Sequence, residues 1–110
     1  QELIKENPGV SSSHSHLGLV YAMLGMKEDA IREGKKAVEL TPMTKDAAWG
    51  PTWLERLATI YIITGEHDKA IELLEQLLSI PSYVTKSRLK MDPDYDPLRD
   101  NPRFMGLIAK

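Results

Sequence analysis

The chain has 110 residues, enough for one domain, and its 42% hydrophobic and 27% charged residues are close to the averages of globular proteins. A formal net charge of −2 offers no basic surface for nucleic acid or acidic membranes, and the lack of cysteine excludes disulfides and thiolate chemistry. No apolar run reaches the roughly 18 residues needed to span a bilayer, and no signal peptide is present. These features favour a cytoplasmic domain, with the periplasm left open for a fragment of a longer protein.

Residues 1–10 are predicted to be the remnant of a helix that precedes the first complete helix pair. Pro8 lies about 34 residues before Pro42, which follows a predicted helix. Residues 2–7 would then be the last turns of an earlier helix. Because a truncated array leaves an apolar face in water, this face is also a candidate for homodimer formation.

Residues 11–44 are predicted to form a first repeat, with helices near 12–24 and 27–40. Gly25 ends the first helix, because a left-handed cap is most easily adopted by glycine. Gly18 and Ala30 are small where the two helices must approach closely. The second helix has an apolar stripe and an opposite charged face, which includes Arg32, Glu33, Lys35 and Lys36.

Residues 45–50 are predicted to be an inserted loop, and residues 51–84 a second repeat with helices at 51–64 and 67–79. Pro51 suits the first turn of a helix, where its missing N–H group costs little. The second repeat carries the same spaced residues as the first. Leu57-Ala58, Tyr61, Ala70, Leu77 and Pro81 correspond to Leu17-Gly18, Tyr21, Ala30, Ala37 and Pro42.

Residues 85–110 are predicted to be a short, irregular helical cap on the second repeat. Three Asx-Pro pairs, Asp92-Pro93, Asp96-Pro97 and Asn101-Pro102, each place a capping side chain before a proline at a helix start. The apolar contacts of the cap are expected from Leu89, Met91, Tyr95, Leu98, Phe104, Leu107 and Ile108.

The repeated pattern resembles the tetratricopeptide repeat. The resemblance implies an all-α fold, a right-handed superhelical array of antiparallel helix pairs, and a non-catalytic scaffold for protein–protein interaction. His14 and Leu54 stand where the family favours tryptophan, and Gly34 and Leu74 where it favours an aromatic residue. These departures affect single positions and leave the pairing of helices unchanged.

The stretches 49–51, 79–82 and 96–104 also resemble the C-terminal end of certain bacterial multidomain proteins, in which such repeats follow a catalytic or regulatory module. This resemblance implies the C-terminal part of a larger bacterial signalling or regulatory protein and brings no catalytic residue with it. The alternative is a structural spacer or oligomerisation element without a peptide ligand.

The resemblance implies a concave groove lined by one face of each first helix. By alignment, these residues are Ser12, Ser15, Leu19, Ala22, Met23, Thr52, Glu55, Thr59, Ile62 and Ile63. We expect a mixed, mildly apolar and nearly uncharged groove for a protein or peptide, including another segment of the parent chain. Ser15 and Leu19 replace the lysine and asparagine of chaperone-binding members, which disfavours chaperone tails as ligands. Alternatively, the groove residues pack within the array.

Trp49 and Trp53 lie four residues apart at the end of the inserted loop and fall on one helical face. We favour an interpretation in which both anchor the loop against the second repeat. The alternative is an aromatic hot spot for a partner, where tryptophan is enriched.

We predict no metal site, no cofactor and no catalytic residue. His14 and His16 point to different faces of a helix, and His67 belongs to another element. The acidic residues Asp92, Asp94 and Asp96 lack the glycine and closing glutamate of a calcium loop, so helix capping explains them better. Carboxylates at the start of a helix, such as Glu66, Asp68 and Glu72, respond to the helix dipole.

Overall fold

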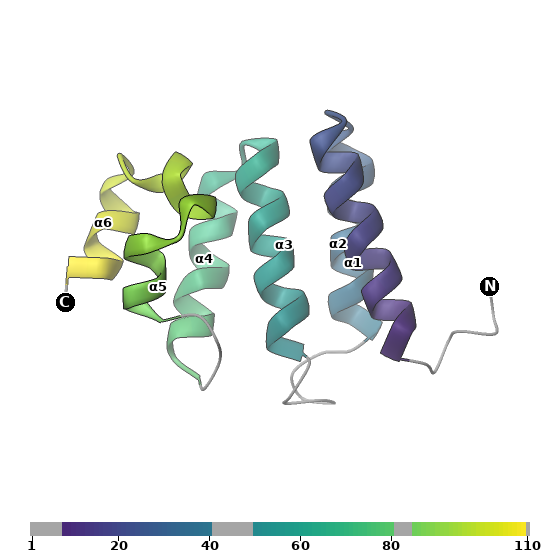
Figure 1. Ribbon diagram of the computed structural model, residues 1–110, viewed down its shortest axis with the longest axis horizontal. Helices are drawn as coiled ribbons and strands as arrows, with labels where there is room; N and C mark the ends of the chain where they lie inside the picture. Colours follow the sequence, from purple (N-terminus) through teal and green to yellow (C-terminus); the bar gives the residue numbers. More distant parts are fainter. Residues whose placement is uncertain (1–7, 41–49, 81–84, 110) are drawn as a thin grey trace.

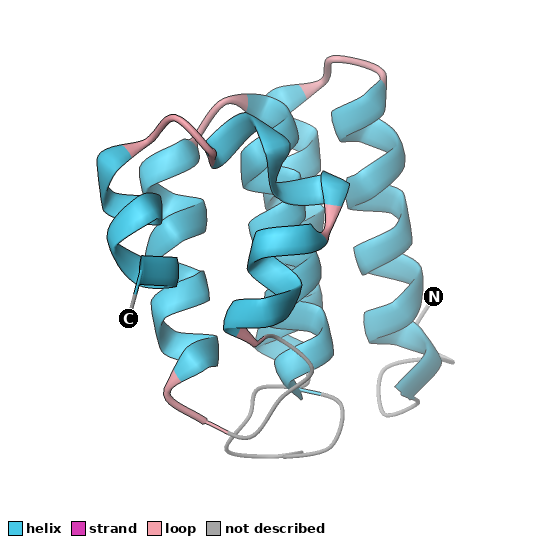
Figure 2. Ribbon diagram, turned by 60° about the vertical axis from the view of Figure 1, so that its left-hand side comes forward, coloured by secondary structure: helices cyan, strands magenta, loops and turns pink. Residues whose placement is uncertain are grey.

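The computed structural model describes residues 8–40, 50–80 and 85–109, and in these ranges it is helical without strands (Figure 2). The helices predicted at 12–24, 27–40, 51–64 and 67–79 are confirmed. The described elements are α1 (Pro8–Met23), α2 (Lys27–Leu40), α3 (Gly50–Thr64), α4 (His67–Leu78), α5 (Lys86–Met91), the 3-10 helix η2 (Pro93–Leu98) and α6 (Pro102–Ala109).

The helices stand side by side in chain order, from α1 and α2 at one end to α6 at the other (Figure 1). α1 packs on α2 and α3, α3 packs on α4, and η2 and α6 pack on the second pair. This arrangement confirms the predicted all-α array of helix pairs with a short helical C-terminal cap. None of the described helices combines the length and the apolar character that crossing a membrane requires.

The N-terminal boundary of the first pair differs from the prediction. α1 begins at Pro8, so residues 8–10 form its first turn and are not part of an earlier helix. Proline is well tolerated in the first turn of a helix, where its N–H group would have no helical partner. Residues 1–7 and residues 41–49 of the predicted loop lie outside the described residues. Gly50, predicted as the last loop residue, is the first residue of α3.

Each pair turns through the same glycine-centred cap. Gly25 has a φ of 82° and Gly65 a φ of 89°, and no other described residue has a positive φ. In the first turn, the N–H group of Met26 donates to the Tyr21 carbonyl at 2.9 Å; in the second, that of Glu66 donates to the Tyr61 carbonyl at 2.8 Å. These bonds are those of a Schellman motif, as the two glycines predict.

Glycine also permits close approach between the helices of the first pair and α3. A Cβ atom on Gly18 would lie 2.9 Å from the carbonyl oxygen of Ala30 and 2.9 Å from Ile60 Cδ1. A Cβ atom on Gly34 would lie 2.8 Å from Leu57 Cδ1. The Ala30 carbonyl belongs to the backbone and cannot move aside, so Gly18 must stay without a side chain for α1 and α2 to pack as they do. The contact at Gly34 is with the end of a leucine side chain, which can shift.

The main apolar core lies between the second pair and the cap. It includes Leu54, Leu57, Tyr61, Ile71, Leu74 and Leu77 of the pair and Leu89, Tyr95, Leu98 and Phe104 of the cap. The rings of Tyr95 and Phe104 stack with centroids 6.4 Å apart. Leu107 and Ile108 pack against this cluster, as predicted, but Met91 is 80% exposed, so its predicted contact is wrong.

Two of the three predicted Asx-Pro caps are confirmed. Asp92 caps η2 by accepting a hydrogen bond from the Asp94 N–H group at 2.9 Å, and Asn101 Oδ1 accepts from the Arg103 N–H group at 2.9 Å at the start of α6. Asp96 does not begin a helix, because Pro97 lies inside η2. Its carboxylate instead accepts from Arg99 Nε at 2.7 Å.

Glu33 was predicted to lie on the charged face of α2, and the structure differs from this prediction. Its side chain is buried, and its Oε1 atom lies 2.6 Å from His14 Nδ1 of α1. Arg32 Nε lies 3.7 Å from the other carboxylate oxygen. The prediction was wrong because helical spacing alone does not show that a histidine on the neighbouring helix reaches this carboxylate.

Candidate binding groove

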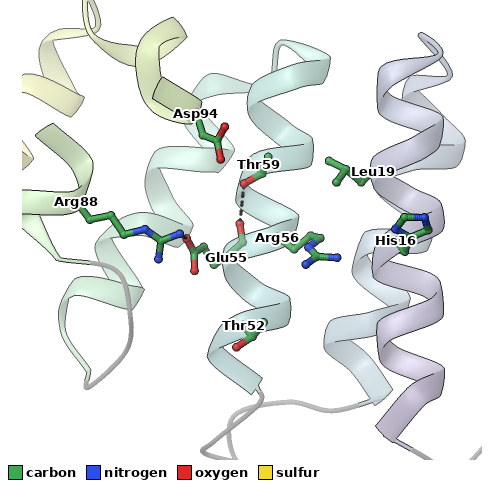
Figure 3. Close-up of a pocket in the computed structure, with 8 residues that line it drawn as sticks. All are labelled: His16, Leu19, Thr52, Glu55, Arg56, Thr59, Arg88 and Asp94. Carbon is green, nitrogen blue, oxygen red and sulfur yellow. Dashed lines mark hydrogen bonds and ion pairs between the residues drawn. The ribbon is translucent and has the colours of Figure 1, made fainter. Parts of the chain in front are cut away.

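A hollow of about 820 Å³ lies between α1, α3 and the cap. Figure 3 shows side chains from all three parts of the chain around it. The lining residues are His16 and Leu19 of α1, Thr52, Glu55, Arg56 and Thr59 of α3, and Arg88 and Asp94 of the cap. We call this hollow the groove.

The structure brings four of the predicted groove residues together. Leu19 comes from α1, and Thr52, Glu55 and Thr59 come from α3. The three α3 residues recur at helical spacing, so they share one face of that helix. Thr59 is fixed there by donating its hydroxyl hydrogen to the Glu55 carbonyl at 3.3 Å.

The other predicted groove residues do not line the hollow. Ser12, Met23 and Ile63 are exposed elsewhere on the surface, whereas Ser15, Ala22 and Ile62 are buried. Ser15 Oγ has no hydrogen-bond partner among the described residues. The buried three pack between helices, which is the alternative that the sequence left open for them.

Four lining residues were missed: His16, Arg56, Arg88 and Asp94. The prediction of a nearly uncharged groove is therefore wrong. Arg56 could have been found, because it shares the helical spacing of Thr52 and Thr59. Arg88 and Asp94 gave no local signal, since they reach the groove only when the cap folds back beside α3.

Glu55 is held by the cap. Arg88 Nη2 lies 2.6 Å from Glu55 Oε2, and the Tyr95 hydroxyl donates to the same oxygen at 3.1 Å. Arg88 Nε also lies 3.4 Å from Asp92 Oδ2. Burial raises the pKa of Tyr95, and the nearby Glu55 carboxylate raises it further. This network joins the second pair to the cap and neutralises Glu55.

Three further ionisable side chains line the groove. Among the described residues, the side chains of His16, Arg56 and Asp94 take part in none of the ion pairs and side-chain hydrogen bonds. Figure 3 shows Arg56 extending from α3 toward α1, opposite Leu19 and His16. Arg56 is half-buried, whereas Asp94 is exposed at the cap edge.

Trp49 lies outside the described residues, so its predicted role beside Trp53 stays a prediction. Trp53 is only 5% exposed, so it packs within the molecule. A partner could not reach this side chain without a rearrangement of α3. Burial therefore contradicts the hot-spot alternative for Trp53.

The histidine and aspartate clusters have structural partners in the described residues. His14 contacts Glu33, and Asp92 caps η2. Within residues 8–40, 50–80 and 85–109, no group of three or more His, Cys, Asp or Glu side chains could hold a metal ion. The arrangement of the groove is suited to hydrogen bonds and ion pairs with a ligand.

Comparisons with known proteins give a match to a family model. No curated protein and no solved structure matches the chain significantly. Residues 54–83, which contain most of α3 and all of α4, match the family model of the tetratricopeptide repeat. Together with the stacked helix pairs, this match supports a tetratricopeptide repeat family for the chain.

Proposed function

We propose that the protein is a non-catalytic interaction module that binds a segment of a protein in the groove. Tetratricopeptide repeats generally mediate protein–protein interactions. The observation that carries the proposal is the hollow of about 820 Å³ between α1, α3 and the cap, whose lining combines an aliphatic side chain with hydroxyl and charged groups.

The lining favours an extended segment over a fully apolar helix. Leu19 offers one aliphatic contact, while Thr52 and Thr59 offer hydroxyl groups to the main chain or side chains of a ligand. Polar groups of this kind fix the orientation of a ligand more than they add affinity. The segment belongs either to another protein or to a different part of the parent chain.

The similarity of stretches 49–51, 79–82 and 96–104 to bacterial multidomain proteins supports a narrower proposal. The groove would then serve a larger bacterial signalling or regulatory protein in the cytoplasm, as its C-terminal scaffold. The sequence of the full-length gene product would test this, since the narrower proposal requires a catalytic or regulatory module before the repeats.

Site-specific photocrosslinking in cells of the source organism tests the groove. A photoreactive amino acid at Thr59 should capture a protein segment, whereas the same amino acid at Lys36, exposed on α2 outside the groove, should not. Mass spectrometry of the crosslinked peptide identifies the occupant. Equal capture at Thr59 and Lys36, or capture at Lys36 alone, would contradict groove binding.

A second candidate function is self-association through the outer face of α1. Leu17 is 39% exposed and Leu24 is 68% exposed, although the residue equivalent to Leu17 in the second pair, Leu57, is buried. Exposed apolar side chains favour association when a second copy buries them. Sedimentation equilibrium should show a dimer that Leu24→Glu disrupts; a monomer at all concentrations would eliminate this candidate.

A further inference from the structure

Resting on the proposed function, we propose that the groove selects segments carrying an acidic side chain, which pairs with Arg56. The groove contains charges of both signs, so its preference depends on which of them are already neutralised inside the molecule. The contacts of each lining charge decide this.

Glu55 and Arg88 neutralise each other. The 2.6 Å ion pair between them is reinforced by the Tyr95 hydroxyl on Glu55 and by Asp92 beside Arg88. A ligand would have to break this network to use either charge. Breaking a partly buried, hydrogen-bonded pair leaves an uncompensated charge, which is strongly unfavourable. The pair therefore takes no part in selecting the ligand.

Arg56 is the shielded charge that a ligand can still pair with. Its side chain is half-buried and has no ion pair among the described residues. A guanidinium group that has lost part of its hydration gains more from a carboxylate than a fully hydrated one does, because the local dielectric constant is lower. A planar guanidinium can also hold a carboxylate through two parallel hydrogen bonds.

Asp94 favours a basic ligand, but less strongly than Arg56 favours an acidic one. It is exposed at the cap edge, where water screens its charge and where ion pairs contribute little. His16 lies on the same side of the groove as Leu19, and its ring nitrogens can donate or accept a hydrogen bond, so this side chain does not distinguish an acidic ligand from a basic one (Figure 3). The balance of these charges favours an acidic ligand over a basic one.

Selection from a random dodecapeptide display library tests this preference without knowledge of the natural partner. Groove-dependent binders are those captured by the unchanged protein but not by a Thr59→Trp variant, whose indole fills the hollow. We expect Asp and Glu to be enriched in these binders relative to the starting library. Replacing the acidic residue of a selected peptide with its amide should weaken binding at least about tenfold.

The decisive variant reverses the charge of Arg56. Selection on Arg56→Glu should enrich Lys and Arg in place of Asp and Glu, because the sign of the shielded charge has changed. Lys36→Glu makes the same change in net charge outside the groove and should leave the acidic preference intact. Arg56→Gln, which adds no charge of opposite sign, should simply remove the preference. Circular dichroism and thermal melting verify that each variant is folded.

The outcomes separate this inference from the proposed function. Groove-dependent binders without acidic enrichment would overturn the acidic preference while leaving peptide binding in place. An acidic preference that persists in Arg56→Glu would overturn the role of Arg56. Absence of any binder sensitive to Thr59→Trp would count against both proposals.

Discussion

The two helix pairs share one internal design but have different surroundings. The pair α3/α4 is enclosed by α1 and α2 on one side and by the cap on the other. The pair α1/α2 packs on α3, and no described helix covers the opposite side of α1 (Figure 1). Equivalent residues therefore differ in exposure: Leu57 is 5% exposed and Leu17 is 39% exposed.

This difference shows how a repeat is stabilised. The turns at Gly25 and Gly65 have the same hydrogen bonds, so the local sequence determines them independently of neighbours. Burial of the helix faces depends instead on which element lies next in the array, as expected when each repeat contacts only its neighbours. The cap acts for the second pair as a further repeat would.

Truncation of equivalent leucines should give the largest contrast between the pairs. Leu57→Ala should destabilise the protein by about 2–5 kcal/mol, because it leaves a cavity beside Gly34. Leu17→Ala should cost about 1 kcal/mol, because the side chain already contacts water. Urea denaturation measures both free energies of unfolding. Equal losses would show that the two faces are equally buried in solution.

Enlarging the small residue Gly18 of α1 should give the next largest loss of stability. Gly18→Ala should cost about 1–3 kcal/mol, since the new Cβ atom meets the Ala30 carbonyl oxygen and cannot be accommodated by a side-chain movement. Gly106→Ala in α6 is the control, because no atom lies within 4 Å of the new Cβ. It should be neutral or stabilise the helix by up to about 1 kcal/mol. Thermal melting measures both effects. Equal changes in melting temperature for Gly18→Ala and Gly106→Ala would contradict the role of close approach at Gly18.

Alkaline pH should lower the stability of the protein through two tyrosines, one in the second pair and one in the cap. Burial raises the pKa of Tyr95 and of Tyr61, so the folded protein keeps these protons when the unfolded chain, with an ordinary tyrosine pKa near 10, loses them. The stabilisation is complete below about pH 10 and is lost as pH rises through the raised values. Urea denaturation at increasing pH should show falling stability.

Tyr95→Phe identifies the source of this slope. At neutral pH the variant should be about 1 kcal/mol less stable than the unchanged protein, because it lacks the hydrogen bond to Glu55. Its stability should fall less steeply as the pH rises above about 10. An unchanged alkaline slope would show that Tyr95 is not the titrating group that matters.

The two turns should give the smallest and most similar effects. Gly25→Ala and Gly65→Ala each place a side chain at positive φ, with no atom within 4 Å of the new Cβ. Each should cost about 1 kcal/mol from backbone strain alone. A clearly larger loss at Gly65 in thermal melts would show that enclosure also affects the turns.

Much of the fold could be predicted because its determinants are local or periodic. The glycines at the turns and the Asx-Pro pairs at Asp92 and Asn101 favour particular backbone geometries, and Gly18 permits close approach of two helices. The groove face of α3 could be predicted for the same reason, since Thr52, Glu55 and Thr59 recur at helical spacing.

The pairing of charges around the groove could not be predicted, because it depends on contacts between residues far apart in the sequence. Glu55 meets Arg88 and Tyr95 only when the cap folds onto the second pair. The burial of Glu33 likewise depends on His14 from another helix. Periodicity identifies the face on which a side chain lies, but it does not identify the opposite charge that folding brings to it.

Native-state amide hydrogen exchange tests most directly whether the second pair and cap form the stable unit against which α1 completes the groove. We expect amides in the centre of α3 and α4 to exchange only through global unfolding, and amides of α1 to exchange through a smaller, local opening. Protection of α1 equal to that of α3 would contradict the account.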